Sequence, residues 1–138
     1  MNTGLQIAVS SDLEAGQVAR RAIAASEPTL PPSVQGDVSL LLTELVANAV
    51  LHGGDGTDRP VQVGLQRHDD RIRVEVIDGG TAFEPSPVPP HADSVGGWGL
   101  VLVDRIAERW GVSPTQAGKC VWFELLASAE HRRSPVSV

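Results

Sequence analysis

A chain of 138 residues, 41% of them hydrophobic, is long enough for one compact domain and too hydrophobic for a disordered protein. The net charge of −6 and the scattered distribution of the 11 basic residues argue against nucleic-acid binding, which requires clustered Lys and Arg. No apolar run approaches the ~20 residues of a transmembrane helix, the N-terminus does not resemble a signal peptide, and the single cysteine cannot form an internal disulfide. We therefore expect a small, acidic, cytoplasmic domain that binds neither nucleic acid nor a membrane.

The first part of the chain predicts one strand and two helices. Residues 5–10 alternate between apolar and polar side chains, as in a half-buried strand. An amphipathic pattern over residues 13–26 predicts a helix, and the prolines that follow end it. A second helix is expected from Val34 to about His52, with Ser33 as its N-cap.

The middle of the chain predicts a β-hairpin followed by a long loop. Alternating apolar residues at 61–66 and 71–78 flank a polar connection, which is typical of two antiparallel strands. Residues 79–97 contain four prolines and four glycines. Loops of this length are uncommon in compact domains and are usually functional.

The last part predicts a helix over residues 99–110, ended by Gly111, and a strand over 120–126. A further strand near 112–115 would pair with that final strand. We expect residues 128–138 to form a disordered tail.

The order strand–helix–helix–strand–strand–loop–helix–strand–strand predicts an α+β fold. We expect a two-layer α/β sandwich, in which a mostly antiparallel sheet is covered on one face by three helices. One domain would comprise residues 1–127.

Candidate functional residues begin with a polar line on the second helix. Glu44, Asn48 and His52 are four residues apart and therefore lie on one helix face. A positioned carboxylate such as Glu44 can accept a proton, and the amide oxygen of Asn48 is a suitable ligand for Mg²⁺. Alternatively, the line is a solvated stripe beside the core, and His52 bonds a carbonyl of the last helical turn.

Two glycine-containing motifs follow. Asp78 ends an alternating run and precedes two glycines, so its carboxylate could accept from an amino group such as that of adenine, or could simply form a turn. The stretch GGWGL, residues 96–100, stands at a helix start, where backbone N–H groups can bind phosphate. It could equally be a hinge.

The final turn and strand contribute two further candidates. Lys119 could reach a phosphate, although a lysine in a turn is usually only solvated. Cys120 has the character of a small core residue rather than of a reactive thiol.

The order of these motifs closely resembles that of the ATP-binding domain of the GHKL (Bergerat-fold) superfamily. Within it, the segments ELVANAVLHGG, VEVIDGG, GGWGLVLVDRIAERWGV and GKCVWFELL are similar to the small anti-sigma-factor serine/threonine kinases and their actinobacterial relatives. The resemblance covers about residues 5–127, and implies a Bergerat fold that binds ATP and Mg²⁺.

The resemblance also implies roles for the residues of the second helix. Asn48 matches the asparagine that ligates Mg²⁺ and links it to the phosphates of ATP. Glu44 matches the glutamate that acts as a general base toward a substrate hydroxyl. His52 matches a residue common in these kinases.

The glycine motifs match the nucleotide-binding motifs of the family. Asp78 matches the aspartate that accepts from the adenine amino group, and Gly80 matches the glycine that admits the ring. Gly97, Gly99 and Leu100 match the second glycine box, whose backbone amides surround the phosphates. The proline-rich stretch before that box matches the ATP lid.

Three positions depart from the family pattern. The first glycine box, usually Asp-x-Gly-x-Gly, has Ala82 in place of its last glycine. Relatives often have Arg where this chain has Trp98, and many have Thr near Cys120.

The implied function is Mg²⁺-dependent phosphoryl transfer from ATP to a serine or threonine of a STAS-type anti-anti-sigma factor, together with sequestration of a sigma factor. The resemblance also implies homodimers. The three departures raise the alternative of a catalytically weak or inactive regulatory module that binds a sigma factor or a STAS protein. A sensor histidine kinase is less expected, because the chain has no helix hairpin bearing a phosphoacceptor histidine.

Overall fold

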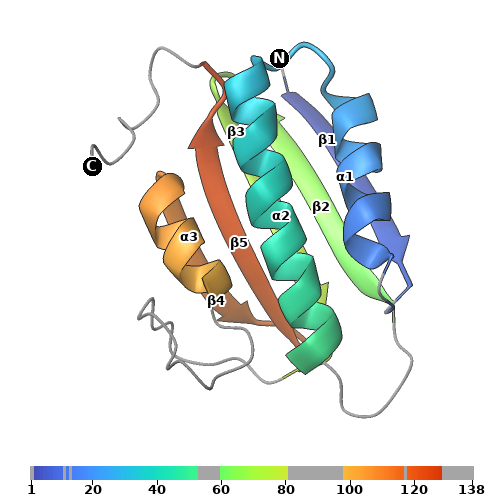
Figure 1. Cartoon of the computed structure of the whole chain (residues 1–138). Coiled ribbons are helices and arrows are strands. Elements are labelled where there is room, and N and C mark those ends of the chain that lie inside the picture. The colour runs from blue at the N-terminus through green and yellow to red at the C-terminus, as the bar shows by residue number, and fades with distance from the viewer. Residues whose placement is uncertain are drawn as a thin grey trace.

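The computed structural model describes residues 2–10, 12, 14–52, 60–80, 98–116 and 118–128. These residues form two layers, a sheet and a set of helices that covers one of its faces (Figure 1). The elements in chain order are β1 (Asn2–Val9), α1 (Ala15–Ser26), α2 (Pro32–His52), β2 (Val61–His68), β3 (Arg71–Asp78), α3 (Trp98–Ile106), β4 (Arg109–Pro114) and β5 (Lys119–Leu126). The predicted α+β sandwich and its element order are confirmed.

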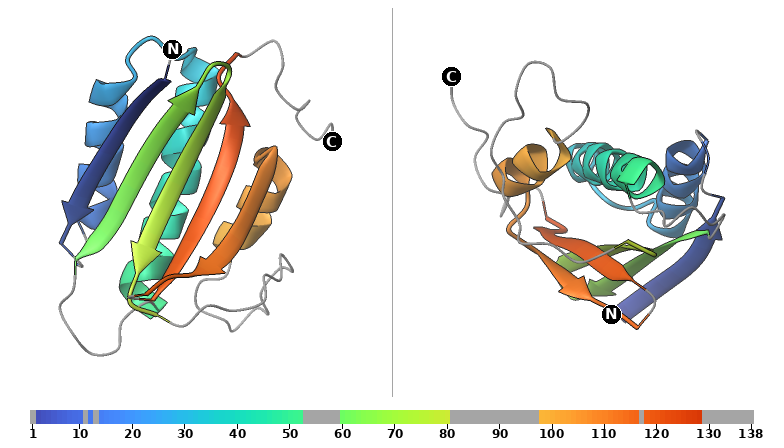
Figure 2. Two further views of the ribbon diagram at one scale, coloured as in Figure 1. Left: turned by 180° about the vertical axis from the view of Figure 1, so that it is seen from behind. Right: turned by 90° about the horizontal axis from the view of Figure 1, so that it is seen from below.

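The sheet has five strands in the order β1-β2-β3-β5-β4, and every neighbouring pair is antiparallel. Strand β3 is central and pairs with β2 on one side and β5 on the other (Figure 2). The β2–β3 hairpin turns at Asp69, whose φ of 53° lies in the left-handed region that Asp tolerates. The predicted hairpin is therefore confirmed.

The hydrophobic core lies between the sheet and the helices. Alternate residues of β3 and β5 point toward the helices and are buried, as the period of two in the sequence predicts. The residues of these two strands and of α2 that belong to the hydrophobic core are Val34, Val38, Leu41, Leu42, Leu45, Val46, Ala49, Ile72, Val74, Val76, Val121, Phe123 and Leu125. The helix α2 lies between α1 and α3, so it provides the centre of the helical layer (Figure 1).

The start of α2 differs from the prediction by two residues. The helix begins at Pro32 rather than after Ser33. Proline suits the first helical position, because its fixed φ is helical and the N–H that it lacks would have no partner in the helix.

The end of α3 also differs from the prediction. The helix ends at Ile106, and Gly111 lies within β4 instead of ending the helix. Pairing with β5 overrides the local helical pattern here, since the N–H of Glu108 already donates to the carbonyl oxygen of Glu124 at 2.9 Å. Glycine at position 111 leaves room for a neighbour, because a Cβ there would lie 2.9 Å from the Trp122 ring.

Two other predictions concern segments with few described residues, the long loop and the tail. Residues 81–97 of the loop, which include the expected ATP lid, lie outside the described part, so the function expected of the loop remains a prediction. The predicted tail consists largely of residues outside the described part, so its disorder remains a prediction. Within the described residues, no helix is both long enough and apolar enough to cross a membrane.

Two adjacent leucines of α2 test the position of the core. Leu41 is fully buried, whereas Leu40 is 41% exposed. We expect Leu41→Ala to lower the free energy of unfolding by about 2–5 kcal/mol, through lost burial and a residual cavity. The matched control Leu40→Ala should change it by roughly 0.5 kcal/mol or less. Urea denaturation measures both, and equal effects would contradict the described packing of α2.

Candidate active site

Four element ends meet at one end of the molecule. The C-terminal ends of α2 and β3 lie there together with the N-terminal ends of α3 and β5 (Figure 1). Antiparallel pairing of β3 with β5 places Asp78 directly opposite Lys119. The candidate residues from distant parts of the sequence are thereby brought to a common region.

Glu44 and Asn48 lie on the flank of α2 that faces away from α1. The opposite flank is identified by Thr43, whose hydroxyl accepts a hydrogen bond from Arg20 of α1 at 3.1 Å. At 100° per residue, Glu44 and Asn48 lie beside the buried face but on its other side. That flank faces α3, because α2 lies between α1 and α3 (Figure 1).

Both side chains are half-buried, and neither makes a hydrogen bond or an ion pair with any part of the chain that the structure describes. Their oxygens are hard donors of the kind that Mg²⁺ accepts alongside phosphate and water. The residues present therefore fit a magnesium–nucleotide complex. His52 ends α2, but its side chain lies outside the described part.

Asp78 is a buried carboxylate on the helix-facing side of the sheet. It has the same strand parity as Val74 and Val76, which pack into the core. Its Oδ1 accepts the backbone N–H of Gly80 at 2.7 Å and the ammonium Nζ of Lys119 at 2.7 Å. The N–H of Gly80 therefore helps to hold the carboxylate, while the roles of Asp78 and Gly80 in binding adenine remain predictions.

Lys119 is the first residue of β5 and is buried rather than solvated in a turn. Only 8% of its side chain and 5% of that of Asp78 are exposed. A buried charge is costly unless it is paired and hydrogen-bonded, so each of these two groups stabilises the other. The solvated alternative for Lys119 is therefore wrong, and the lysine belongs to the Asp78 end of the site.

Gly118 is a contributor that sequence reasoning missed. A Cβ at this position would collide with the carbonyl oxygen of Asp78 and would lie 2.6 Å from Cα of Gly79. The glycine therefore allows the start of β5 to approach the end of β3, and so it allows Lys119 to reach Asp78. The sequence does show a glycine directly before an alternating run. Only the pairing of β5 with β3 shows that this glycine is needed for the close contact with the Asp78 turn.

The helix α3 begins at Trp98 and includes Gly99 and Leu100 in its first turn. The first N–H groups of a helix have no partner within it, and they carry the positive end of the helix dipole. This end of α3 can therefore attract phosphate oxygens. Gly97 and Ala82 lie outside the described residues, so their roles remain predictions.

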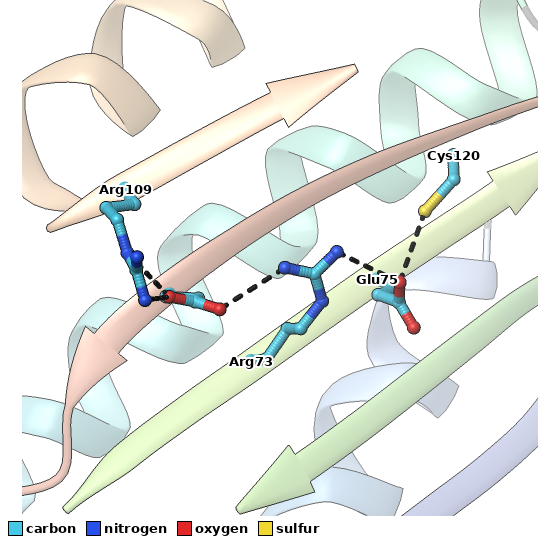
Figure 3. A network of polar contacts seen from close by, with 5 residues as sticks. Arg73, Glu75, Arg109 and Cys120 are labelled. Carbon is cyan, nitrogen blue, oxygen red and sulfur yellow. Dashed lines mark hydrogen bonds and ion pairs between the residues drawn. The ribbon is translucent and has the colours of Figure 1, made fainter. Parts of the chain in front are cut away.

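The opposite face of the sheet carries a polar network (Figure 3). Arg73 pairs with Glu75 at 3.4 Å and with Glu124 at 3.2 Å, and Arg109 pairs with the other oxygen of Glu124. The Arg73 guanidinium also lies 4.1 Å from the ring centroid of Trp122. These contacts cover the sheet where no helix does.

Cys120 belongs to this outer network and points away from the helix-facing side on which Asp78 lies. Its thiol donates to Glu75 Oε2 at 3.6 Å (Figure 3). Burial, followed by the Glu75 carboxylate, raises the pKa of the Cys120 thiol from its ordinary value of 9.0 to about 12. This agrees with the prediction that Cys120 is not a reactive thiol.

Replacing Gly118 tests the close approach of β5 to the Asp78 turn. We expect Gly118→Ala to destabilise the fold by about 1–3 kcal/mol, because the added methyl group overpacks the contact. Gly36→Ala is the control, since nothing lies within 4 Å of the Cβ that it adds in α2, and it should be neutral or stabilising by up to about 1 kcal/mol. A Gly118→Ala protein as stable as the wild type in urea denaturation would contradict the described contact.

Alkylation tests the environment of Cys120. The thiolate is the nucleophile, so at pH 9 we expect iodoacetamide to label the native protein on the order of 100-fold more slowly than the urea-unfolded protein. The stability contributed by the protonated thiol is complete below pH 9 and decreases as the pH rises from 9 toward 12. The Cys120→Ser variant gives the background, and a native labelling rate that levels off above pH 9, as it does in the unfolded protein, would contradict the raised pKa.

Comparisons with known proteins agree with this geometry. No curated protein matches the chain. The crystal structure of the RsbU and RsbW domains of Rv1364c from Mycobacterium tuberculosis has a similar fold, with a TM-score of 0.69 and 21% sequence identity. The similarity covers 99% of this chain and 34% of that one, so this chain spans about a third of its length. The histidine kinase-like ATPase domain matches residues 9–125, and the chain therefore belongs to the histidine kinase-like ATPase domain family.

Proposed function

We propose that the protein binds ATP with Mg²⁺ and transfers the γ-phosphoryl group to a serine or threonine of a STAS-type anti-anti-sigma factor. The observation that carries the proposal is the position of Glu44 and Asn48. These oxygen donors share the flank of α2 that faces α3, at half-buried positions and without a partner in the described part of the chain. A purely structural stripe does not require this combination.

The base of ATP would bind at the Asp78 end. A buried carboxylate is an acceptor only, and it suits the exocyclic amino group of adenine. The hydrogen bond from the Gly80 N–H to Asp78 orients the carboxylate before the base arrives. Pre-organisation of this kind lowers the cost of binding.

The phosphates would bind between α2 and the start of α3. The N–H groups of the first turn of α3, around Gly99 and Leu100, would donate to phosphate oxygens. The amide oxygen of Asn48 would hold Mg²⁺, which neutralises phosphate charge when bound. Positioning and electrostatics supply most of the acceleration in phosphoryl transfer.

Glu44 would receive the proton of the attacking hydroxyl. It lies one helical turn before Asn48 on the same flank, so it can serve a substrate that approaches the phosphate. The resemblance to anti-sigma-factor kinases and the similarity to a structure that contains an RsbW domain support the choice of a STAS protein and a sigma factor as partners. Sequestration of a sigma factor belongs to the same proposal.

Two substitutions on α2 test the proposal. Asn48→Ala should weaken Mg-ATP binding by roughly 10–100-fold or more, because loss of even an outer-shell partner of a metal has an effect of this size. The substitution should weaken ATP binding less when EDTA removes the Mg²⁺. Glu44→Gln should leave binding within about threefold and slow phosphoryl transfer to a STAS protein by roughly 10²–10⁴-fold. Calorimetry measures the first effect and transfer of labelled phosphate the second.

The control is Gln62→Ala, an exposed position on the outer face of β2 that should alter neither binding nor transfer. Absence of heat with Mg-ATP from the wild-type protein would refute nucleotide binding. Binding without transfer to any STAS partner would favour the regulatory module instead. Equal transfer by Glu44→Gln would remove Glu44 from the mechanism.

A further inference from the structure

We propose that Lys119 reads the base of the nucleotide: together with Asp78 it forms a donor–acceptor pair that recognises N1 and the 6-amino group of adenine. The inference rests on the proposed function, because it requires the base to bind at Asp78. It assigns Lys119 to base specificity rather than to the phosphates.

The position of Lys119 supports this role. The residue lies directly opposite Asp78 in the β3–β5 register, and its Nζ is 2.7 Å from Asp78 Oδ1. Both side chains are on the helix-facing side of the sheet and more than nine-tenths buried. A lysine held in this way is at the carboxylate end of the site.

The hydrogen bonds of Asp78 leave one oxygen for a ligand. Oδ1 accepts from both Gly80 and Lys119, whereas Oδ2 accepts no hydrogen bond from the residues that the structure describes. Oδ2 is therefore the oxygen that an amino group of a ligand would meet. The ammonium group stands beside it, so an acceptor and a donor are presented next to each other.

The Watson–Crick edge of adenine has the complementary pattern. Its 6-amino group donates, and its neighbouring N1 accepts. A carboxylate can only accept and an ammonium group can only donate, so Asp78 would take the amino group and Lys119 would donate to N1. Guanine and hypoxanthine have the reverse pattern, with a carbonyl oxygen at position 6 and an N–H at position 1.

The surrounding backbone fixes the position of the Asp78 carboxylate. The Gly80 N–H holds Oδ1 of Asp78, and the absence of a Cβ at Gly118 allows the start of β5 to lie against that turn. A 6-oxo purine in the same pose would place its carbonyl oxygen against the carboxylate. Like charges or lone pairs in contact are unfavourable, so we expect adenine to be selected over guanine.

A purely structural role for Lys119 would be to neutralise buried Asp78. Such a lysine would affect nucleotide binding only by holding the carboxylate. The two roles differ in one respect, because a base-reading lysine loses its effect when N1 of the base is removed, whereas a neutralising lysine does not.

The test is a double-mutant cycle between the protein and the ligand, measured by calorimetry on the full chain. The probes are Mg-ADP and its 1-deaza analogue, in which a C–H group replaces N1 and the amino group remains. In the wild-type protein we expect the analogue to bind roughly tenfold or more weakly than ADP, as expected for loss of one hydrogen bond to a charged group. In Lys119→Met, ADP and the analogue should bind with equal affinity.

Loss of the ammonium group leaves Asp78 buried without its cation, so Lys119→Met can unfold. The same cycle is therefore repeated with the single variant Asp78→Asn and the double variant Asp78→Asn/Lys119→Met. Neither of these proteins has the carboxylate charge at position 78, so the loss of the lysine does not leave a buried charge unpaired. A cycle in which Lys119→Met weakens both nucleotides by the same factor would overturn the base-reading role and leave nucleotide binding intact. No binding of Mg-ADP to the wild-type protein would overturn both this inference and the proposed function.

Discussion

The pairing of β3 with β5 is the interaction on which the site depends. It aligns Asp78 with Lys119, which are 41 residues apart in the chain, and it buries Val74 against Phe123 in the same register. A shift of one residue would reverse the face of every side chain in the strand. Because the apolar residues strongly favour one register, the charged pair at the strand ends is placed by the packing of the core.

The polar groups on the two faces of the sheet lie in different environments. On the helix side, the polar side chains of Asp78 and Lys119 are buried at the end of the core, where unpaired charges would be costly. On the outer side, Arg73 and Arg109 share the carboxylate of Glu124, whose side chain is 13% exposed, and the Arg109 end of this network is open to solvent. Cys120, although adjacent to Lys119 in sequence, therefore shares neither its environment nor its chemistry.

Local sequence patterns were sufficient wherever an element was long and regular. The apolar spacing of α2 and the alternation in β2, β3 and β5 predicted these elements and their buried faces. The prediction was wrong at the end of α3, because the backbone N–H of Glu108 donates a hydrogen bond to the carbonyl oxygen of Glu124 in β5. No local pattern contains a hydrogen bond to a strand that comes 16 residues later.

The amino-acid sequence by itself determined the two-layer fold class, the order of the elements and the polar line of Glu44 and Asn48. These depend on the period of the hydrophobic residues and on spacing along one helix, both of which are local. Only the tertiary structure decided that Lys119 contacts Asp78 and that Gly118 permits this contact. The reason is that both facts depend on the register between two strands, and that register results from core packing between residues far apart in the chain.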